Sequence, residues 1–99
     1  MTQFDVYRRR NGRGLLLDCQ ADLLSALNTR LVVPLLPRDS APKPADRLNP
    51  IFTVAGAEMV MLTQFAAAVR MEELGECIAS LAEHRYTITN ALDLMITGY

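Results

Sequence analysis

A long helical pattern occupies residues 80–99, and a helix with one apolar face requires the rest of the chain to form an apolar surface. Ser80 and Glu83 have the spacing of a capping box, in which two side chains bond free amides at a helix start. Gly98 stands where a left-handed residue commonly ends a helix. Between them, apolar residues recur on one helical face: Leu81, Ile88, Ala91, Leu92 and Met95. Such a helix needs an apolar body to pack against, and the residues after it form a short tail at a defined place.

The first part of the chain has the pattern of a β-hairpin. Residues 3–9 alternate apolar and polar side chains with a period of two, which is typical of a half-buried strand. Asn11 and Gly12 are a type I′ turn signal, and residues 15–20 predict the returning strand. Residues 22–28 predict a short loop or a turn of helix. The fold is therefore expected to begin with two antiparallel strands.

Three further strands are predicted before the helix. Residues 30–36 form a β-branched apolar run, in which Pro34 removes one donor from the strand ladder. The proline-rich residues 37–44 predict an irregular surface loop. Residues 48–54 and 58–64 predict two paired strands around a tight turn.

Two interpretations stay open for the segment that follows. Residues 66–69 have helix propensity, whereas a short strand over residues 69–72 fits equally well. Residues 74–76 predict a turn that leads into the final helix. The expected fold class is α+β. Five or six antiparallel strands form a small barrel-like sheet, followed by one C-terminal helix, in a single domain of residues 1–99.

Composition excludes several classes of protein. The chain has 99 residues, of which 51% are hydrophobic and 21% charged, and this excludes a disordered protein. A net charge of −1 gives no general electrostatic case for binding nucleic acid. Residues 1–10 lack the apolar run of a secretion signal, and the uncharged run at 59–69 is too short to span a bilayer. We expect a cytoplasmic protein without membrane attachment, with Cys19 and Cys77 reduced and buried.

The sequence shows no catalytic constellation. His84 is the only histidine, and no cysteine or acidic cluster lies near it at metal-ligand spacing, so a surface or interface position is expected. The hairpin tip predicts either a phosphate-contacting patch or a solvated tip, and the absence of interleaved aromatic residues favours the solvated tip. It contains Arg8, Arg9, Arg10 and Arg13. We therefore predict a protein that is not an enzyme, holds no metal or cofactor, and binds through a surface or its tail.

Short segments along nearly the whole chain form a further pattern. They are Gln3-Phe4, Val6-Tyr7, Leu17-Asp18, Gln20, Asp22, Arg30, Val32 to Leu35, Leu48 to Pro50, Leu62-Thr63, Leu74-Gly75, His84-Arg85, Ala91 to Met95 and Gly98. In their order and spacing, these segments resemble the CcdB family, the toxin half of a bacterial toxin–antitoxin module. Each segment is a weak signal alone, but the order of all of them is specific.

The resemblance implies a small SH3-like barrel of the CcdB/MazF type with a C-terminal helix, assembled as a homodimer. Such toxins bind the A subunit of DNA gyrase and trap it with its DNA cleaved, a mechanism used in plasmid maintenance. A CcdA-like antitoxin neutralises the toxin, which also acts as corepressor in the antitoxin's DNA complex without itself reading bases. By position, the implied gyrase-binding residues are Leu23, Leu24, Asp93, Ile96, Thr97, Gly98 and Tyr99.

The tail departs from the family pattern. The best-known members carry a tryptophan third from the end, which stacks on a gyrase arginine; this chain has Thr97 there, and Tyr99 replaces a terminal isoleucine. Two alternatives stay open. A MazF/Kid-type endoribonuclease toxin would bind RNA with the arginine tip and use Arg30 or His84 as acid–base groups. A non-toxic chromosomal homologue would retain only antitoxin binding.

Overall fold

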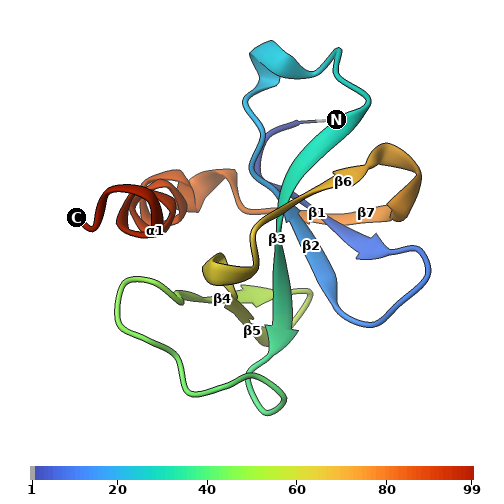
Figure 1. Cartoon of the computed structure of the whole chain (residues 1–99). Coiled ribbons are helices and arrows are strands. Elements are labelled where there is room, and N and C mark those ends of the chain that lie inside the picture. Colours follow the sequence, from blue (N-terminus) through green and yellow to red (C-terminus); the bar gives the residue numbers. More distant parts are fainter. Residues whose placement is uncertain (1) are drawn as a thin grey trace.

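The computed structural model describes residues 2–99 as strands, one α-helix and four short 3-10 helices. The strands are β1 (Asp5–Arg9), β2 (Leu15–Asp18), β3 (Thr29–Pro37), β4 (Ile51–Val54), β5 (Ala57–Met61), β6 (Ala67–Arg70) and β7 (Leu74–Ser80). The 3-10 helices are η1 (Asp22–Leu24), η2 (Thr63–Phe65), η3 (Met71–Glu73) and η4 (Ala82–His84). The α-helix, α1 (Arg85–Thr97), lies at one side of the curled sheet (Figure 1).

The seven strands form one curled sheet in the order β4-β5-β3-β2-β1-β7, with β6 paired to β3. Strand β3 runs through its centre (Figure 1). Two strands share one edge of β3: residues 29–32 pair with β6, and residues 35–37 pair with β5. Pro34, which has no amide to donate, lies between these two pairings. The curled antiparallel sheet and its C-terminal helix confirm the predicted α+β fold class.

Both faces of the central strands are buried, so adjacent residues in these strands are apolar. Successive side chains of a strand point to opposite faces, so neighbours in the sequence enter different clusters. The main core, which α1 helps to close, contains Val6, Leu17, Val33 and Ile88. The smaller cluster on the opposite face contains Tyr7, Leu16, Val32 and Leu74. A register slip of one residue would exchange the two sets, so the strand pairing is strongly specified.

The prediction of a turn at residues 74–76 and of a capping box at Ser80 is wrong. Strand β7 occupies this stretch and pairs with β1 along its outer edge. Gly75 marks a close approach of two strands, since a Cβ there would lie 3.0 Å from the carbonyl oxygen of Arg8. The Ser80 hydroxyl accepts a bond from the Ala82 amide, at 3.2 Å, and α1 begins only at Arg85, after η4.

Other boundaries shift by a few residues. Strand β4 begins at Ile51, after a turn, and β5 ends at Met61, shortly before η2, so both strands are shorter than the predicted ranges 48–54 and 58–64. The strand interpretation of the next segment is the right one, with β6 two residues earlier than expected, at Ala67–Arg70. Seven strands therefore replace the predicted five or six.

The two cysteines differ in environment. Cys19 is buried, as predicted, and its burial, with a smaller effect of the Asp18 charge, raises the pKa of the thiol to about 12. The Cys19 thiol is therefore protonated at neutral pH. The prediction that Cys77 is buried is wrong, because its position on β7, an edge strand of the curled sheet, leaves it exposed. Across residues 2–99, no helix is long and apolar enough to cross a membrane.

Candidate functional site

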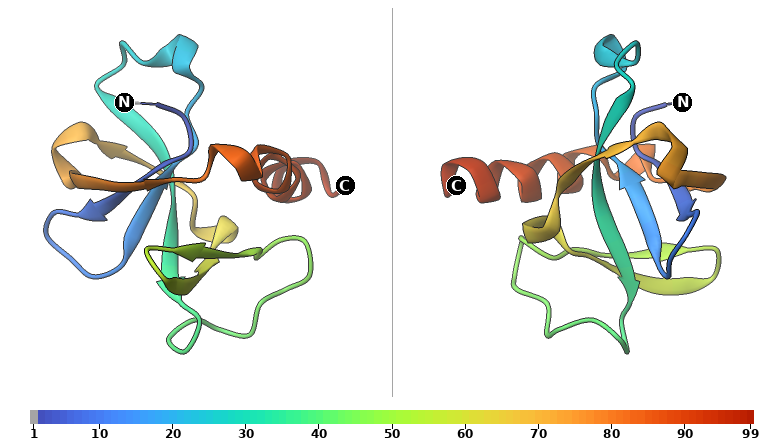
Figure 2. Two further views of the ribbon diagram at one scale, coloured as in Figure 1. Left: turned by 180° about the vertical axis from the view of Figure 1, so that it is seen from behind. Right: turned by 45° about the vertical axis from the view of Figure 1, so that its right-hand side comes forward.

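Helix α1 is anchored at its middle and exposed at its end. Ile88 and Ala91 are fully buried in the main core, and Leu92 packs against it, so the predicted apolar face is right over these residues. Toward the end of the helix the side chains emerge: Met95 is 50% exposed and Ile96 is 79% exposed. Figure 2 shows the helix projecting beyond the sheet, with the C-terminus at its far end.

The tail after α1 has a main chain fixed by local hydrogen bonds. Gly98 has a φ angle of 82°, and its amide donates to the Leu94 carbonyl at 2.9 Å, which confirms the predicted helix end. The Thr97 hydroxyl donates to the Asp93 carbonyl at 2.7 Å and accepts from the Tyr99 amide at 3.3 Å. Thr97 thus folds the tail, whereas the side chain of Tyr99 is largely exposed.

Within one chain, the predicted site residues form two separate groups. Leu23 and Leu24 lie on η1, where Leu23 is 92% exposed. This turn is at the top of Figure 1, away from the C-terminus, and both views in Figure 2 agree. The last turn of α1 and the tail bring the remaining predicted residues together: Asp93, Ile96, Thr97, Gly98 and Tyr99.

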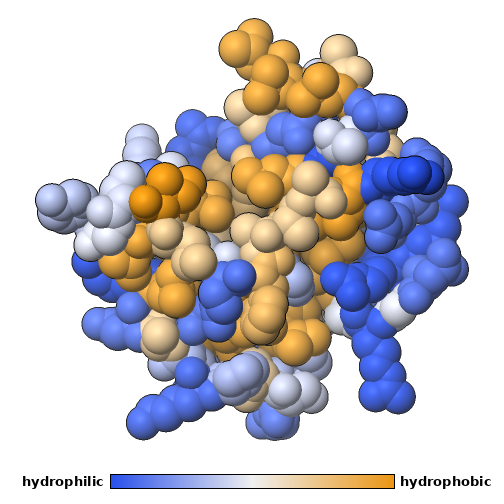
Figure 3. Space-filling model, viewed as in Figure 1, coloured by the Kyte–Doolittle hydropathy of each residue, from blue (hydrophilic) through white to orange (hydrophobic). Residues whose placement is uncertain are grey.

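A second exposed apolar surface spans β3, β6, η2 and α1. We call it the β6 face and define it by the exposed side chains of Leu31, Phe65, Ala68 and Met95. Leu31 pairs with Ala68 across the sheet, and η2, which carries Phe65, contacts α1. Phe65 is 57% exposed. Figure 3 shows apolar side chains spread across the side of the molecule on which β6 and η2 lie. Large apolar surfaces of this kind commonly mark protein interfaces.

The arginine tip is surrounded by acidic and carbonyl groups. The Arg8 Nε lies 3.4 Å from the Glu76 Oε1, and the Arg10 guanidinium donates to the Leu74 carbonyl at 3.2 Å. Glu73 lines the same hollow as Arg9. This mixed arrangement is typical of a solvated hairpin tip and leaves little unopposed positive charge for a phosphate chain.

A groove of about 470 Å³ lies between the β1–β2 hairpin and the β4–β5 turn. Two arginines, Arg8 and Arg13, line it. Its apolar lining comes from Leu15, Leu36, Val54, Met59 and Ile78. The combination of apolar floor and basic side chains suits a peptide segment with both apolar and acidic residues.

The two candidate acid–base residues of the nuclease alternative lie in different environments. Arg30 is completely buried, and its guanidinium holds the Asp18 carboxylate, with Nε 3.1 Å and Nη2 2.5 Å from Oδ2. Its Nη1 finds no hydrogen-bond partner within residues 2–99. His84 is partly exposed, with its Nε2 3.6 Å from the Glu83 Oε1 and its ring centroid 5.0 Å from that of Phe52. Arg30 in this state cannot touch a substrate.

Among the described residues, no group of three or more histidine, cysteine, aspartate or glutamate side chains is arranged to hold a metal ion. Apart from Asp93, the exposed side chains of the last turn of α1 and the tail are apolar (Met95 and Ile96), a hydroxyl (Thr97) or aromatic (Tyr99). This end of the molecule therefore presents an exposed, mostly uncharged surface on a main chain that local hydrogen bonds define.

Two comparisons with known proteins bear on this arrangement. The family model described as "CcdB protein" matches residues 3–98. Among solved structures, an endoribonuclease in complex with its cognate antitoxin, from mycobacterial species, superposes with a TM-score of 0.79. The match covers 97% of this chain and 94% of that chain, at 14% sequence identity. At this identity the structural likeness concerns the fold alone.

Proposed function

This chain belongs to the CcdB family of toxins from toxin–antitoxin systems, and from that premise we propose that its target is the A subunit of DNA gyrase. In this proposal the protein acts in the cytoplasm by binding the gyrase–DNA complex after cleavage, and it performs no catalysis. The observation that carries the proposal is the end of α1, where exposed Ile96 and Tyr99 side chains extend from a main chain that is already fixed. A preformed binding element loses little conformational entropy on association.

The β6 face supports a homodimer. A two-fold axis makes the same patch meet itself, and stable interfaces bury about 800 Å² on each partner. Because Met95 belongs to this face, self-association across it would bring the two α1 helices close together. The paired tails would then form a symmetric wedge between the two A subunits of gyrase.

Replacing Phe65 with glutamate is expected to separate the dimer. The two-fold axis would place two carboxylates in the apolar interface, and burying unpaired charge costs several kcal/mol, so the dimer should weaken by at least about 100-fold. Sedimentation at micromolar concentration measures this directly. The matched control is Tyr86→Glu, since Tyr86 is 78% exposed in a different hollow, beside Gln3. An unchanged sedimentation coefficient for Phe65→Glu would contradict the proposed interface.

A CcdA-like antitoxin is the second proposed partner, through its acidic and flexible C-terminal segment. The groove between the β1–β2 hairpin and the β4–β5 turn supports this, because Arg13 can complement an acidic side chain while the apolar lining accepts others. The groove lies apart from the tail, so one dimer can carry antitoxin there. Corepression would follow from this complex, in which the antitoxin reads the DNA.

Purified protein, incubated with plasmid, gyrase and ATP, tests the proposed target. We expect linearised plasmid only when all components are present, since the protein supplies no nuclease chemistry of its own. Cleavage of RNA by the protein alone would instead support the endoribonuclease alternative; the solved structure with a similar fold is an endoribonuclease, although the two chains share only 14% identity. The buried state of Arg30 argues against this alternative. Normal growth of a sensitive host that produces the soluble protein would support the non-toxic alternative.

A further inference from the structure

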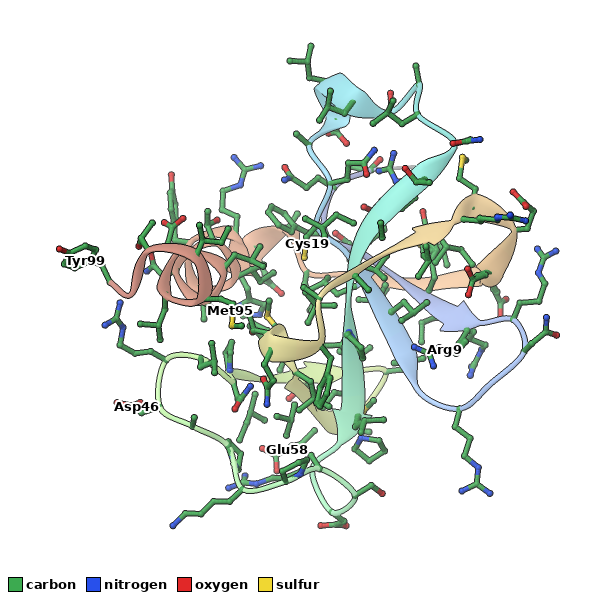
Figure 4. The ribbon with its side chains drawn as sticks, in the orientation of Figure 1. Arg9, Cys19, Asp46, Glu58, Met95 and Tyr99 are labelled. Atoms are coloured by element: carbon green, nitrogen blue, oxygen red, sulfur yellow. The ribbon has the colours of Figure 1, made fainter. Side chains whose placement is uncertain are left out.

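The tail also contacts a segment far from it in the sequence. The Arg47 guanidinium donates through Nη2 to the main-chain oxygen of Tyr99. Arg47 belongs to the long loop between β3 and β4, and Figure 4 shows the neighbouring Asp46 on this loop, below the end of α1 and on the same side of the molecule as the labelled Tyr99. The views in Figure 2 also place this loop next to the C-terminal end of the helix. A loop residue thus reaches the proposed target-binding element.

The turn that presents Arg47 is fastened to the barrel by a buried asparagine. The Asn49 amide nitrogen donates to the Met61 carbonyl at 3.0 Å and to the Gln64 side-chain oxygen at 2.8 Å. Its amide oxygen accepts from the Ala45 main chain at 2.9 Å. Asn49 is only 6% exposed, so these bonds are shielded from water and hold the turn to β5 and η2.

The backbone of Arg47 takes an uncommon conformation within this turn. Its φ angle is 64°, in the left-handed region that side-chain-bearing residues seldom adopt. Residues in this region persist where the surrounding structure holds them, and such positions cluster at functional sites. Here the surrounding bonds come from Asn49 and from the Thr63 hydroxyl, which donates to the Leu48 carbonyl at 2.5 Å. The result is a cationic side chain held against the negative end of the α1 dipole.

We propose that Arg47 is a positioning residue for the target-binding tail. This inference rests on the proposed function for its effect on affinity. Arg47 fixes the main chain of Tyr99, while Thr97 fixes it from the helix side. With both bonds in place, the Ile96 and Tyr99 side chains keep one arrangement before the partner arrives. Without Arg47, the partner would have to order the tail on binding, and affinity would fall.

Arg47→Ala is expected to release the tail and leave the barrel intact. We expect the NMR order parameters of the Gly98 and Tyr99 amides to fall below about 0.6, the range of flexible main chain. Affinity for the gyrase A subunit should fall about tenfold, while the melting temperature stays within about 2 °C of the parent. Arg47→Lys, which keeps the charge and one donor, should retain most of the order and affinity.

The matched control is Arg38→Ala on the same loop. Arg38 pairs with Glu58 at 3.2 Å, with both side chains more than half exposed, and it does not contact the tail. This variant should match the parent in both measurements. Unchanged order parameters in Arg47→Ala would overturn the inference, and so would a mobile tail with unchanged affinity. If the parent protein fails to bind gyrase, the target proposal fails, whereas the order parameters still decide whether Arg47 holds the tail.

Discussion

Replacing Arg30 with methionine is expected to lower the free energy of unfolding by about 3–5 kcal/mol. The guanidinium and the Asp18 carboxylate are both fully buried, so the substitution leaves a negative charge in the interior without its partner. A domain of this size has a total stability of about 5–15 kcal/mol, so the loss removes a large part of it. Urea denaturation followed by circular dichroism gives the change in free energy directly.

Two further variants separate the loss of the ion pair from a general effect of removing arginine. Arg38→Met breaks an exposed pair with Glu58 and should cost no more than about 1 kcal/mol. The second variant combines Arg30→Met with Asp18→Asn, which removes the other buried charge. Asparagine keeps an oxygen for the Gln20 main-chain N–H, which in the parent lies 3.0 Å from Asp18 Oδ1. The double variant should recover part of the stability. If Arg30→Met alone loses less than about 1 kcal/mol, the pair is not the structural centre that its burial indicates.

Deleting residues 97–99 is expected to abolish growth arrest in a sensitive host. The deletion removes the Tyr99 ring, the helix-ending Gly98 and the bonds that fix the tail. An aromatic side chain that is exposed in the free protein and buried in a complex often contributes about 2 kcal/mol or more to the binding free energy. That energy corresponds to about a 30-fold change in affinity. Fold and dimer should persist, because all three residues are exposed and none belongs to either core cluster.

Single substitutions identify which side chains of the tail are needed for growth arrest. Tyr99→Ala and Ile96→Ala should each weaken gyrase binding strongly, whereas Tyr86→Ala, an exposed tyrosine elsewhere on the helix, should change it little. Thr97→Trp restores the family's aromatic residue but loses the hydroxyl that bonds Asp93 and Tyr99. We expect a net gain in affinity, since the Gly98–Leu94 bond keeps the helix end. A truncated protein that still kills would exclude the wedge mechanism.

Local signals predicted the parts of the fold that depend on neighbouring residues. The end of α1 follows from Gly98, whose left-handed conformation is a property of glycine itself. The β1–β2 hairpin follows from the alternation of its strands and from Asn11-Gly12. The strand at residues 29–37 follows from its β-branched run. In each case the pattern that specifies the element lies within the element.

Features that depend on distant contacts could not be predicted in this way. From the sequence, Gly75 is interpreted as a turn residue. In the structure it lies in β7, where the Arg8 carbonyl of the neighbouring strand leaves no room for a side chain. Ser80 indicated a helix start, although pairing with Asp5 keeps it in β7. The contact of Arg47 with Tyr99 joins residues 52 positions apart, and no periodicity or motif signals it. Asn49 and Thr63, two polar residues that the fold buries, indicate that the turn is held in place.

Because β1 pairs with β7, the sheet cannot be completed until β7 has been synthesised. The strand at residues 5–9 forms its outer ladder with residues 74–80, so the sheet stays open until most of the chain has left the ribosome. At about 5–20 residues per second, this interval lasts several seconds, and non-local pairing of this kind is slow to form even afterwards. A nascent chain lacks the completed sheet against which α1 packs. Any activity of the proposed tail site can therefore start only after translation has passed β7.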